Sequence, residues 1–263
     1  MRLQWAVISS FCALGGITFA QQYPLAVDLE LVIAVDVSYS MDVEEQQVQR
    51  QGYVAAFRSP EIVNALRGGA LGKVAVTYIE WGGSAVQVVP WSLIDSPESA
   101  ARFADALQRQ PVRRISFTSI SNALAFARAL FRSNGFRASR RIIDVSGDGP
   151  NNAGAPVPVA RNAAVAEGIV IDGLPIVLKG PPGSVSFAEI DVYYEKCVIG
   201  GEGAFILPVT DITQFPQAIR KKLLIEISGL KLTEGRGQQM RLVQYKPYNC
   251  LVGEELQEQS IGK

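Results

Sequence analysis

The chain has 263 residues, with 25 Lys and Arg against 25 Asp and Glu and no histidine. This length, with 48% hydrophobic and 19% charged residues, is typical of a globular protein with a sizeable core, and the formal charge of zero gives no electrostatic footprint for nucleic acid. The absence of histidine excludes Ser-His-Asp catalysis, Cys-His catalysis and His-ligated zinc, so any metal must be held by oxygen atoms or thiolates.

Residues 1–20 have the pattern of an export signal. Arg2 precedes an apolar run over residues 5–19, and Thr18 and Ala20 place small side chains where signal peptidase reads them. A membrane anchor is the alternative, although about 15 apolar residues are few for a membrane span. Cleavage after Ala20 would leave 24 Lys and Arg against 25 Asp and Glu, a net charge of −1, in a periplasmic or secreted protein.

The cysteine content agrees with export. Removal of the signal takes away Cys12 and leaves Cys197 and Cys250. An even pair in an exported chain indicates a disulfide, which would stabilise the fold by about 3–4 kcal/mol through chain entropy. Two free buried thiols are the alternative.

The first half of the chain alternates strand and helix patterns. The run LELVIAV is nearly continuous in apolar residues, which is typical of a strand buried on both faces. Gly82-Gly83 separates two further apolar runs and indicates a hairpin. We therefore expect strands over residues 29–35, 73–81 and 85–91, a helix over residues 42–57, and another helix that starts at Ser96-Pro97-Glu98.

The second half continues the alternation. Apolar residues from Ile120 to Phe131 recur at helical spacing, and Gly135 follows as a stop signal. Further patterns predict strands over residues 141–146, 169–178 and 204–209. They also predict helices over residues 156–168, 187–197 and 211–227.

This order of elements predicts the fold class. Strands that alternate with helices of this length imply crossover connections and a doubly wound α/β fold of the three-layer, Rossmann type. Its sheet is mostly parallel, with one antiparallel edge strand from the hairpin and helices on both faces. Residues 21–227 form this domain. Residues 228–263 are expected to lie over it as an extension, tied back by Cys197–Cys250, with the last ten residues frayed.

Short oxygen-bearing side chains stand at three places in the sequence, two after expected strands and one before an expected helix. Asp36, Ser38 and Ser40 come directly after the first strand, Asp148 follows the fourth, and Thr118 precedes the central helix. Because ligands gather at the carboxyl ends of parallel strands, these side chains predict an all-oxygen site suited to Mg²⁺. Taken alone, the loop after the first strand or the loop after the fourth strand would more often be a helix cap or a turn than a metal site.

These three motifs resemble the metal-ion-dependent adhesion site of von Willebrand factor A (vWA) domains. Asp36, Ser38 and Ser40 match its D-x-S-x-S, Thr118 its central Thr and Asp148 its Asp after the fourth strand. The resemblance covers residues 29–227. The stretches DVSGDGPNN, GYVAAF and CVIGG are similar to an exported bacterial branch of the superfamily that is classed as a domain of unknown function.

The chain departs from the resembled motifs at three positions. Tyr39 stands where glycine is common, Phe117 stands where glycine usually precedes the Thr, and Gly147 replaces the Thr of T-D-G. These departures bear on the shape of the loops and on metal affinity, but none of them removes a ligand.

The resemblance implies a binding function and no enzyme activity. Ser38, Ser40 and Thr118 would coordinate Mg²⁺ directly, with Mn²⁺ or Ca²⁺ as other possible ions. Asp36 and Asp148 would act through water and would hold the hydroxyls. One coordination position of the metal ion would stay open for a carboxylate of a partner protein. We expect no nucleic acid as a partner, and no transmembrane segment after the signal is cleaved.

Two alternatives remain open at this point. A metal-dependent phosphoester hydrolase could use Asp36 as its nucleophile, although Ser38 occupies the place where such enzymes need a second Asp. Asn151 and Asn152 either line the site or form a turn after Pro150.

Overall fold

The protein folds around a five-stranded sheet. The computed structural model describes residues 23–178, 187, 189–229 and 248–262, so the expected export signal over residues 1–20 lies outside the described residues. The strand order is β3-β2-β1-β4-β5. The strands are β1 (Leu25–Asp36), β2 (Val74–Trp81), β3 (Ala85–Ile94), β4 (Phe136–Gly147) and β5 (Val170–Pro175). Only β3 is antiparallel to its neighbour, which confirms the expected hairpin and the mostly parallel sheet.

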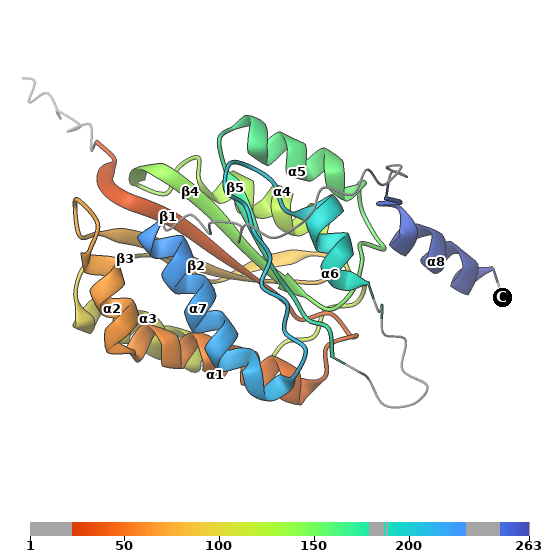
Figure 1. Cartoon of the computed structure of the whole chain (residues 1–263), viewed down its shortest axis with the longest axis horizontal. Coiled ribbons are helices and arrows are strands. Elements are labelled where there is room, and N and C mark those ends of the chain that lie inside the picture. Colours follow the sequence, from red (N-terminus) through yellow and green to blue (C-terminus); the bar gives the residue numbers. More distant parts are fainter. Residues whose placement is uncertain (1–22, 179–186, 188, 230–247, 263) are drawn as a thin grey trace, which may run out of the picture.

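Helices cover both faces of this sheet (Figure 1). One face packs against α1 (Val43–Arg58), α2 (Pro60–Arg67), α3 (Pro97–Gln108) and α7 (Phe215–Ser228). The other packs against α4 (Ile120–Leu130), α5 (Val157–Ala166) and α6 (Ile190–Tyr193). These layers confirm the three-layer α/β fold.

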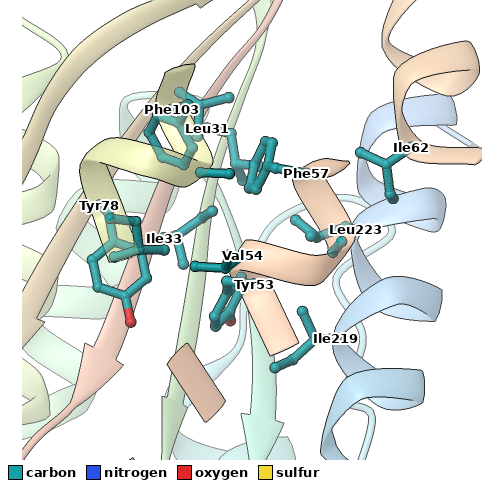
Figure 2. Close-up of a cluster of buried hydrophobic side chains, with 14 of the residues drawn as sticks. Leu31, Ile33, Tyr53, Val54, Phe57, Ile62, Tyr78, Phe103, Ile219 and Leu223 are labelled. Carbon is teal, nitrogen blue, oxygen red and sulfur yellow. The ribbon is translucent and has the colours of Figure 1, made fainter. Parts of the chain in front are cut away.

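The pleat of β1 divides the core in two. Leu31 and Ile33 pack in the layer of α1 and α7, whereas Val32 and Ala34 pack in the layer of α4 and α6. Figure 2 shows the first of these layers, where Phe57 of α1 lies between Phe103 of α3 and Leu223 of α7. A strand buried on both faces reads as a continuous apolar run, which is why LELVIAV identified β1.

A capping box starts α1 immediately after the first candidate loop. The carboxylate of Asp42 accepts a hydrogen bond from the amide of Glu45 at 2.8 Å, and the Glu45 carboxylate accepts one from the amide of Asp42 at 2.9 Å. Such a cap stabilises a helix by about 1 kcal/mol. It also fixes where the chain leaves the loop, two residues after Ser40.

The expected strand over residues 204–209 is wrong as a regular strand. Ile206 and Val209 form isolated parallel bridges with Gly173 and Ile176. The reason lies in Pro175 of β5, which has no N–H to donate to the carbonyl of Leu207, so the ladder is interrupted between the two bridges.

The C-terminal region is more ordered than expected. We expect the last ten residues to fray, but α8 (Val252–Ile261) includes residues 254–261 of this segment. Cys250 precedes this helix and forms a disulfide with Cys197. Cys197 lies in the π-helix η1 (Tyr194–Val198), which continues α6. The predicted disulfide is therefore confirmed, and it ties α8 to the α4–α6 side of the domain.

Among the described ranges, no helix is both long enough and apolar enough to span a bilayer.

Candidate metal centre

The loop after β1 folds around the carboxylate of Asp36. Asp36 ends β1 with no exposed surface, and its Oδ1 accepts a hydrogen bond from the amide of Ser38 at 2.7 Å. This local bond turns the chain so that the hydroxyls of Ser38 and Ser40 lie 2.8 Å apart. Ser38 is buried and Ser40 is exposed, so the pair leads from the core to the surface.

The loop after β4 meets this pair. The hydroxyl of Ser40 donates to Oδ1 of Asp148 at 2.6 Å, although 108 residues separate them in the sequence. The parallel register of β1 and β4, which pairs Val35 with Ser146, brings the two strand ends side by side. Four predicted site residues, Asp36, Ser38, Ser40 and Asp148, are therefore joined by one chain of hydrogen bonds.

Thr118 approaches from the third segment. Its amide donates to Oδ1 of Asn152 at 2.8 Å, and its carbonyl accepts from the amide of Asn152 at 2.8 Å. A Cβ atom at Gly149 would lie 3.9 Å from Oγ1 of Thr118, which places this hydroxyl over the residue that follows Asp148. Asn152 thus fixes the backbone of Thr118 to the loop of Asp148, and a part for Asn152 in the metal site stays a prediction.

Asn151 performs a second, structural task in the same loop. Its Oδ1 accepts from the amide of Ser121 in α4, and its Nδ2 donates to the carboxylate of Glu254 in α8 at 2.8 Å. A Cβ atom at Gly253 would lie 2.1 Å from the carbonyl oxygen of Asn151, so only glycine lets α8 approach so closely. The disulfide-anchored helix is therefore in direct contact with the loop that carries Asp148.

Three exposed side chains surround the hydroxyls. Tyr39 and Phe117 are 60% and 53% exposed, and the guanidinium of Arg114 lies 4.8 Å from the centre of the Tyr39 ring. The parallel bridge between Ser38 and Ile115 places their two loops side by side. Phe117 has φ of 64°, a left-handed conformation that costs a residue with a Cβ about 1–3 kcal/mol. We call Tyr39, Arg114 and Phe117 the rim.

The electrostatics of the site are unfavourable without a cation. Burial and the neighbouring Asp148 raise the pKa of Asp36 well above its usual value, and burial raises the pKa of Asp148. Oδ2 of Asp36 is buried, and no hydrogen-bond donor reaches it among the described residues. The buried carboxylate of Asp36 and the half-buried carboxylate of Asp148 therefore bring negative charge together where no donor among the described residues reaches Oδ2 of Asp36.

The donor set fits a hard cation. It consists of three hydroxyls and two carboxylates, and oxygen atoms are the ligands that Mg²⁺, Mn²⁺ and Ca²⁺ prefer. Within the described part of the chain, no three His, Cys, Asp or Glu side chains form a cluster that could hold a metal. Hydroxyls would thus provide most of the direct ligands, and the role of each residue as a ligand stays a prediction.

The sequence did not identify Tyr194 as a neighbour of this site. A Cβ atom at Gly147 would lie 2.7 Å from Oδ2 of Asp36 and 2.8 Å from the hydroxyl of Tyr194. Tyr194 lies 158 residues after Asp36. It falls in the helix expected over residues 187–197, but no sequence pattern predicted the π-helical geometry of this part. Only the fold reveals that it borders the site.

The family is identified by its sequence model. The model described as "Protein of unknown function (DUF1194)" matches residues 26–231, most of the chain. The chain belongs to this family. A search of curated proteins found no match to this DUF1194 chain.

Solved structures show the same architecture. Proximal thread matrix protein 1 (PTMP1) from the mussel byssus matches 78% of this DUF1194 chain over 49% of its own, with a TM-score of 0.58 and 18% identity. Another crystal structure of that protein, with a zinc-occupied MIDAS motif, matches the same shares with a TM-score of 0.55 and 16% identity.

Two bacterial proteins match as well. The von Willebrand factor type A protein from Catenulispora acidiphila has a TM-score of 0.54 at 15% identity, over 77% of this chain and 43% of that one. The pilus adhesin SpaC from Lactobacillus rhamnosus GG has a TM-score of 0.57 at 12% identity, over 79% and 32%. This DUF1194 chain spans half or less of the length of these proteins, and it has the fold of a vWA domain.

Proposed function

We propose that this protein is an exported, Mg²⁺-dependent protein-binding module whose cation lies among Asp36, Ser38, Ser40, Thr118 and Asp148. The observation that carries the proposal is the hydrogen-bonded chain Ser38–Ser40–Asp148 beside the buried Oδ2 of Asp36, which no donor among the described residues reaches. A bound Mg²⁺ would supply a Lewis acid that accepts a carboxylate of the partner.

The chain's own residues have distinct tasks in this proposal. The hydroxyls of Ser38, Ser40 and Thr118 provide neutral oxygen ligands, so the cation keeps much of its charge for an incoming anion. Asp36 and Asp148 orient these hydroxyls, hold water molecules and supply the negative charge that retains the cation.

Independent observations support export, metal binding and adhesion. The pattern of residues 1–20 and the disulfide agree with an oxidising compartment outside the cytoplasm. The mussel byssus protein holds zinc in its MIDAS motif, and SpaC is named a pilus adhesin. Mn²⁺ and Ca²⁺ would fit the same oxygen ligands, and Mg²⁺ is favoured because a site with few carboxylates suits an ion that keeps several waters.

Phosphoester hydrolysis with Asp36 as nucleophile is less well supported. Asp36 has no exposed surface, and its Oδ1 is held by the amide of Ser38, so neither oxygen is presented to a substrate. Ser38 also replaces the second Asp that would act as acid and base. Turnover of a generic phosphate ester that is lost in Asp36→Asn would favour this alternative.

A pull-down tests the binding function. Immobilised full-length protein is expected to capture a protein from the exported fraction of the source organism in Mg²⁺, to release it in EDTA, and to recapture it when Mg²⁺ is restored. Asp36→Ala is the control and should capture nothing under any of these conditions. Capture that is equal with Mg²⁺ and with EDTA would contradict the proposal.

The rim is expected to set which acidic sequence is bound. Tyr39 and Phe117 offer exposed apolar surface beside the cation, and Arg114 offers positive charge, so they would contact the residues that flank the partner's carboxylate.

Phe117→Gly tests this role of the rim. We expect the variant to be up to about 1 kcal/mol more stable, since glycine adopts a positive φ without strain. Partner capture should fall several-fold, while the affinity for Mg²⁺ should change less than twofold. Leu71→Ala, which truncates another exposed apolar side chain, is the matched control. Unchanged capture by Phe117→Gly would exclude the rim from the interface.

A further inference from the structure

Tyr194 borders the candidate metal centre and packs closely against two glycines, Gly147 and Gly173. The residue is fully buried at the start of the π-helix η1. A Cβ atom at Gly173 of β5 would lie 2.8 Å from Cδ1 of its ring, and one at Gly147 of β4 would lie 2.8 Å from its hydroxyl oxygen. Any larger residue at either position would displace the ring, so the two strands leave room for this one side chain.

The hydroxyl of Tyr194 shares a small space with Asp36. Oδ2 of Asp36 would lie 2.7 Å from the same Cβ position at Gly147, so both oxygens border the Cα of that glycine. Both are buried, and neither has a hydrogen-bond partner within the described part of the structure. Leaving a buried polar group unpaired is unfavourable, and here two such groups, one donor and one acceptor, border the same space.

We infer that Tyr194 is a positioning residue of the metal centre: when the cation is bound, its O–H donates to Oδ2 of Asp36 and fixes the carboxylate in the orientation that holds the cation. The inference rests on the proposed metal-binding function. With Oδ1 already held by the amide of Ser38, a donor to Oδ2 fixes both carboxylate oxygens. A carboxylate oxygen has two lone pairs, so Oδ2 can accept this bond and one from a cation-bound water.

The chemistry of Tyr194 suits this role. Its hydroxyl supplies an O–H donor, and it borders Oδ2 of Asp36, an acceptor that no donor reaches among the described residues. Gly147 carries no hydroxyl where the resembled motif has Thr. In this protein the hydroxyl beside Asp36 is that of Tyr194, which belongs to η1.

The disulfide holds the element that carries Tyr194. Cys197 lies in the same five-residue π-helix and is bonded to Cys250, which precedes α8. π-Helical turns often mark functional sites, because they shift side chains out of the register of a regular helix. The position of the Tyr194 hydroxyl is therefore set by the packing of the ring on Gly173 and by a covalent anchor three residues away.

Tyr194→Phe tests the inference, with Mg²⁺ binding to the full chain measured by titration calorimetry. The variant keeps the ring and loses only the hydroxyl. We expect the Kd for Mg²⁺ to rise roughly 10-fold or more, as is typical when the partner of a metal ligand is removed. The metal-free unfolding midpoint should not fall, because the hydroxyl has no partner there. Tyr53→Phe is the matched control, since Tyr53 is a buried tyrosine that donates to Asp144, away from the site.

A rescue variant separates the hydroxyl from the ring. Tyr194→Phe combined with Gly147→Ser restores a hydroxyl beside Asp36 from the strand, and it should recover most of the lost Mg²⁺ affinity. Gly147→Ser alone should lower the affinity, because its Cβ crowds both Asp36 and Tyr194. Equal Kd values for wild type and Tyr194→Phe, or no recovery in a folded double variant, would overturn the inference alone. Failure of the wild type to bind Mg²⁺ would overturn the proposed function, and the inference with it.

Discussion

Asp36→Asn is expected to abolish the stabilisation that Mg²⁺ gives to the wild-type protein. At about 100 times its Kd, Mg²⁺ should raise the wild-type free energy of unfolding by about 2.7 kcal/mol. The amide has the shape of the carboxylate without its charge, so it cannot retain the cation. Thermal or urea unfolding with and without Mg²⁺ measures the difference.

The metal-free variant should not be less stable than the metal-free wild type. Because burial and Asp148 raise the pKa of Asp36, this carboxyl favours folding while it is protonated, and the benefit is lost as pH rises through the raised pKa. At neutral pH its ionised form opposes folding. Asp95→Asn, an exposed carboxylate outside the site, is the matched control and should keep the full Mg²⁺ effect. Equal Mg²⁺ effects for Asp36→Asn and wild type would refute the assignment of the site.

Lys222→Met is expected to destabilise the protein by about 3–5 kcal/mol. The ammonium of Lys222 in α7 is fully buried, lies 2.7 Å from Oδ1 of Asp144 in β4, and forms a second ion pair with Glu226. Burial alone lowers the pKa of Lys222, but its carboxylate neighbours raise it overall, so the side chain stays charged. Its removal leaves two buried carboxylates uncompensated, which is costlier than the ion pair is favourable.

Lys221→Met provides the comparison, because Lys221 is the exposed neighbour on the same helix and should change stability by less than about 0.5 kcal/mol. Urea unfolding of both variants measures the difference. In the Lys222→Met background, Asp144→Asn and Glu226→Gln should recover part of the loss, since they remove the uncompensated charges. A loss below about 1 kcal/mol in Lys222→Met would show that this cluster is not charged as described.

The order of strands and helices was predictable because the signals are local. A strand buried on both faces is a continuous apolar run, and residues 29–35 form one at the centre of β1. Two elements were misjudged. Ser59-Pro60-Glu61 is an ordinary start signal for α2, and Pro175 in the neighbouring strand cannot donate to a continuous ladder with residues 204–209.

The same distinction applies to the candidate site, where some residues have a local sequence signal and others have none. Asp36, Ser38 and Ser40 lie in one short motif, Asp148 follows a strand and Thr118 precedes a helix, so the sequence is enough to propose all five, and their role as ligands stays a prediction. Tyr194 has no such signal, since its place depends on the register of two strands, two glycines and a π-helix. The charge cluster at Lys222 was invisible for the same reason, because contacts across layers leave no periodic trace in the sequence.

The pleat of β1 imposes a parity rule on the site. Val35 packs with the α1 and α7 layer, whereas Asp36 turns to the opposite face, where Tyr194 and Trp81 lie. Adding or removing one residue in β1 would send every following side chain to the wrong face, while a change of two would preserve the facing. Variation in the length of this strand can therefore keep the carboxylate in place only in even steps.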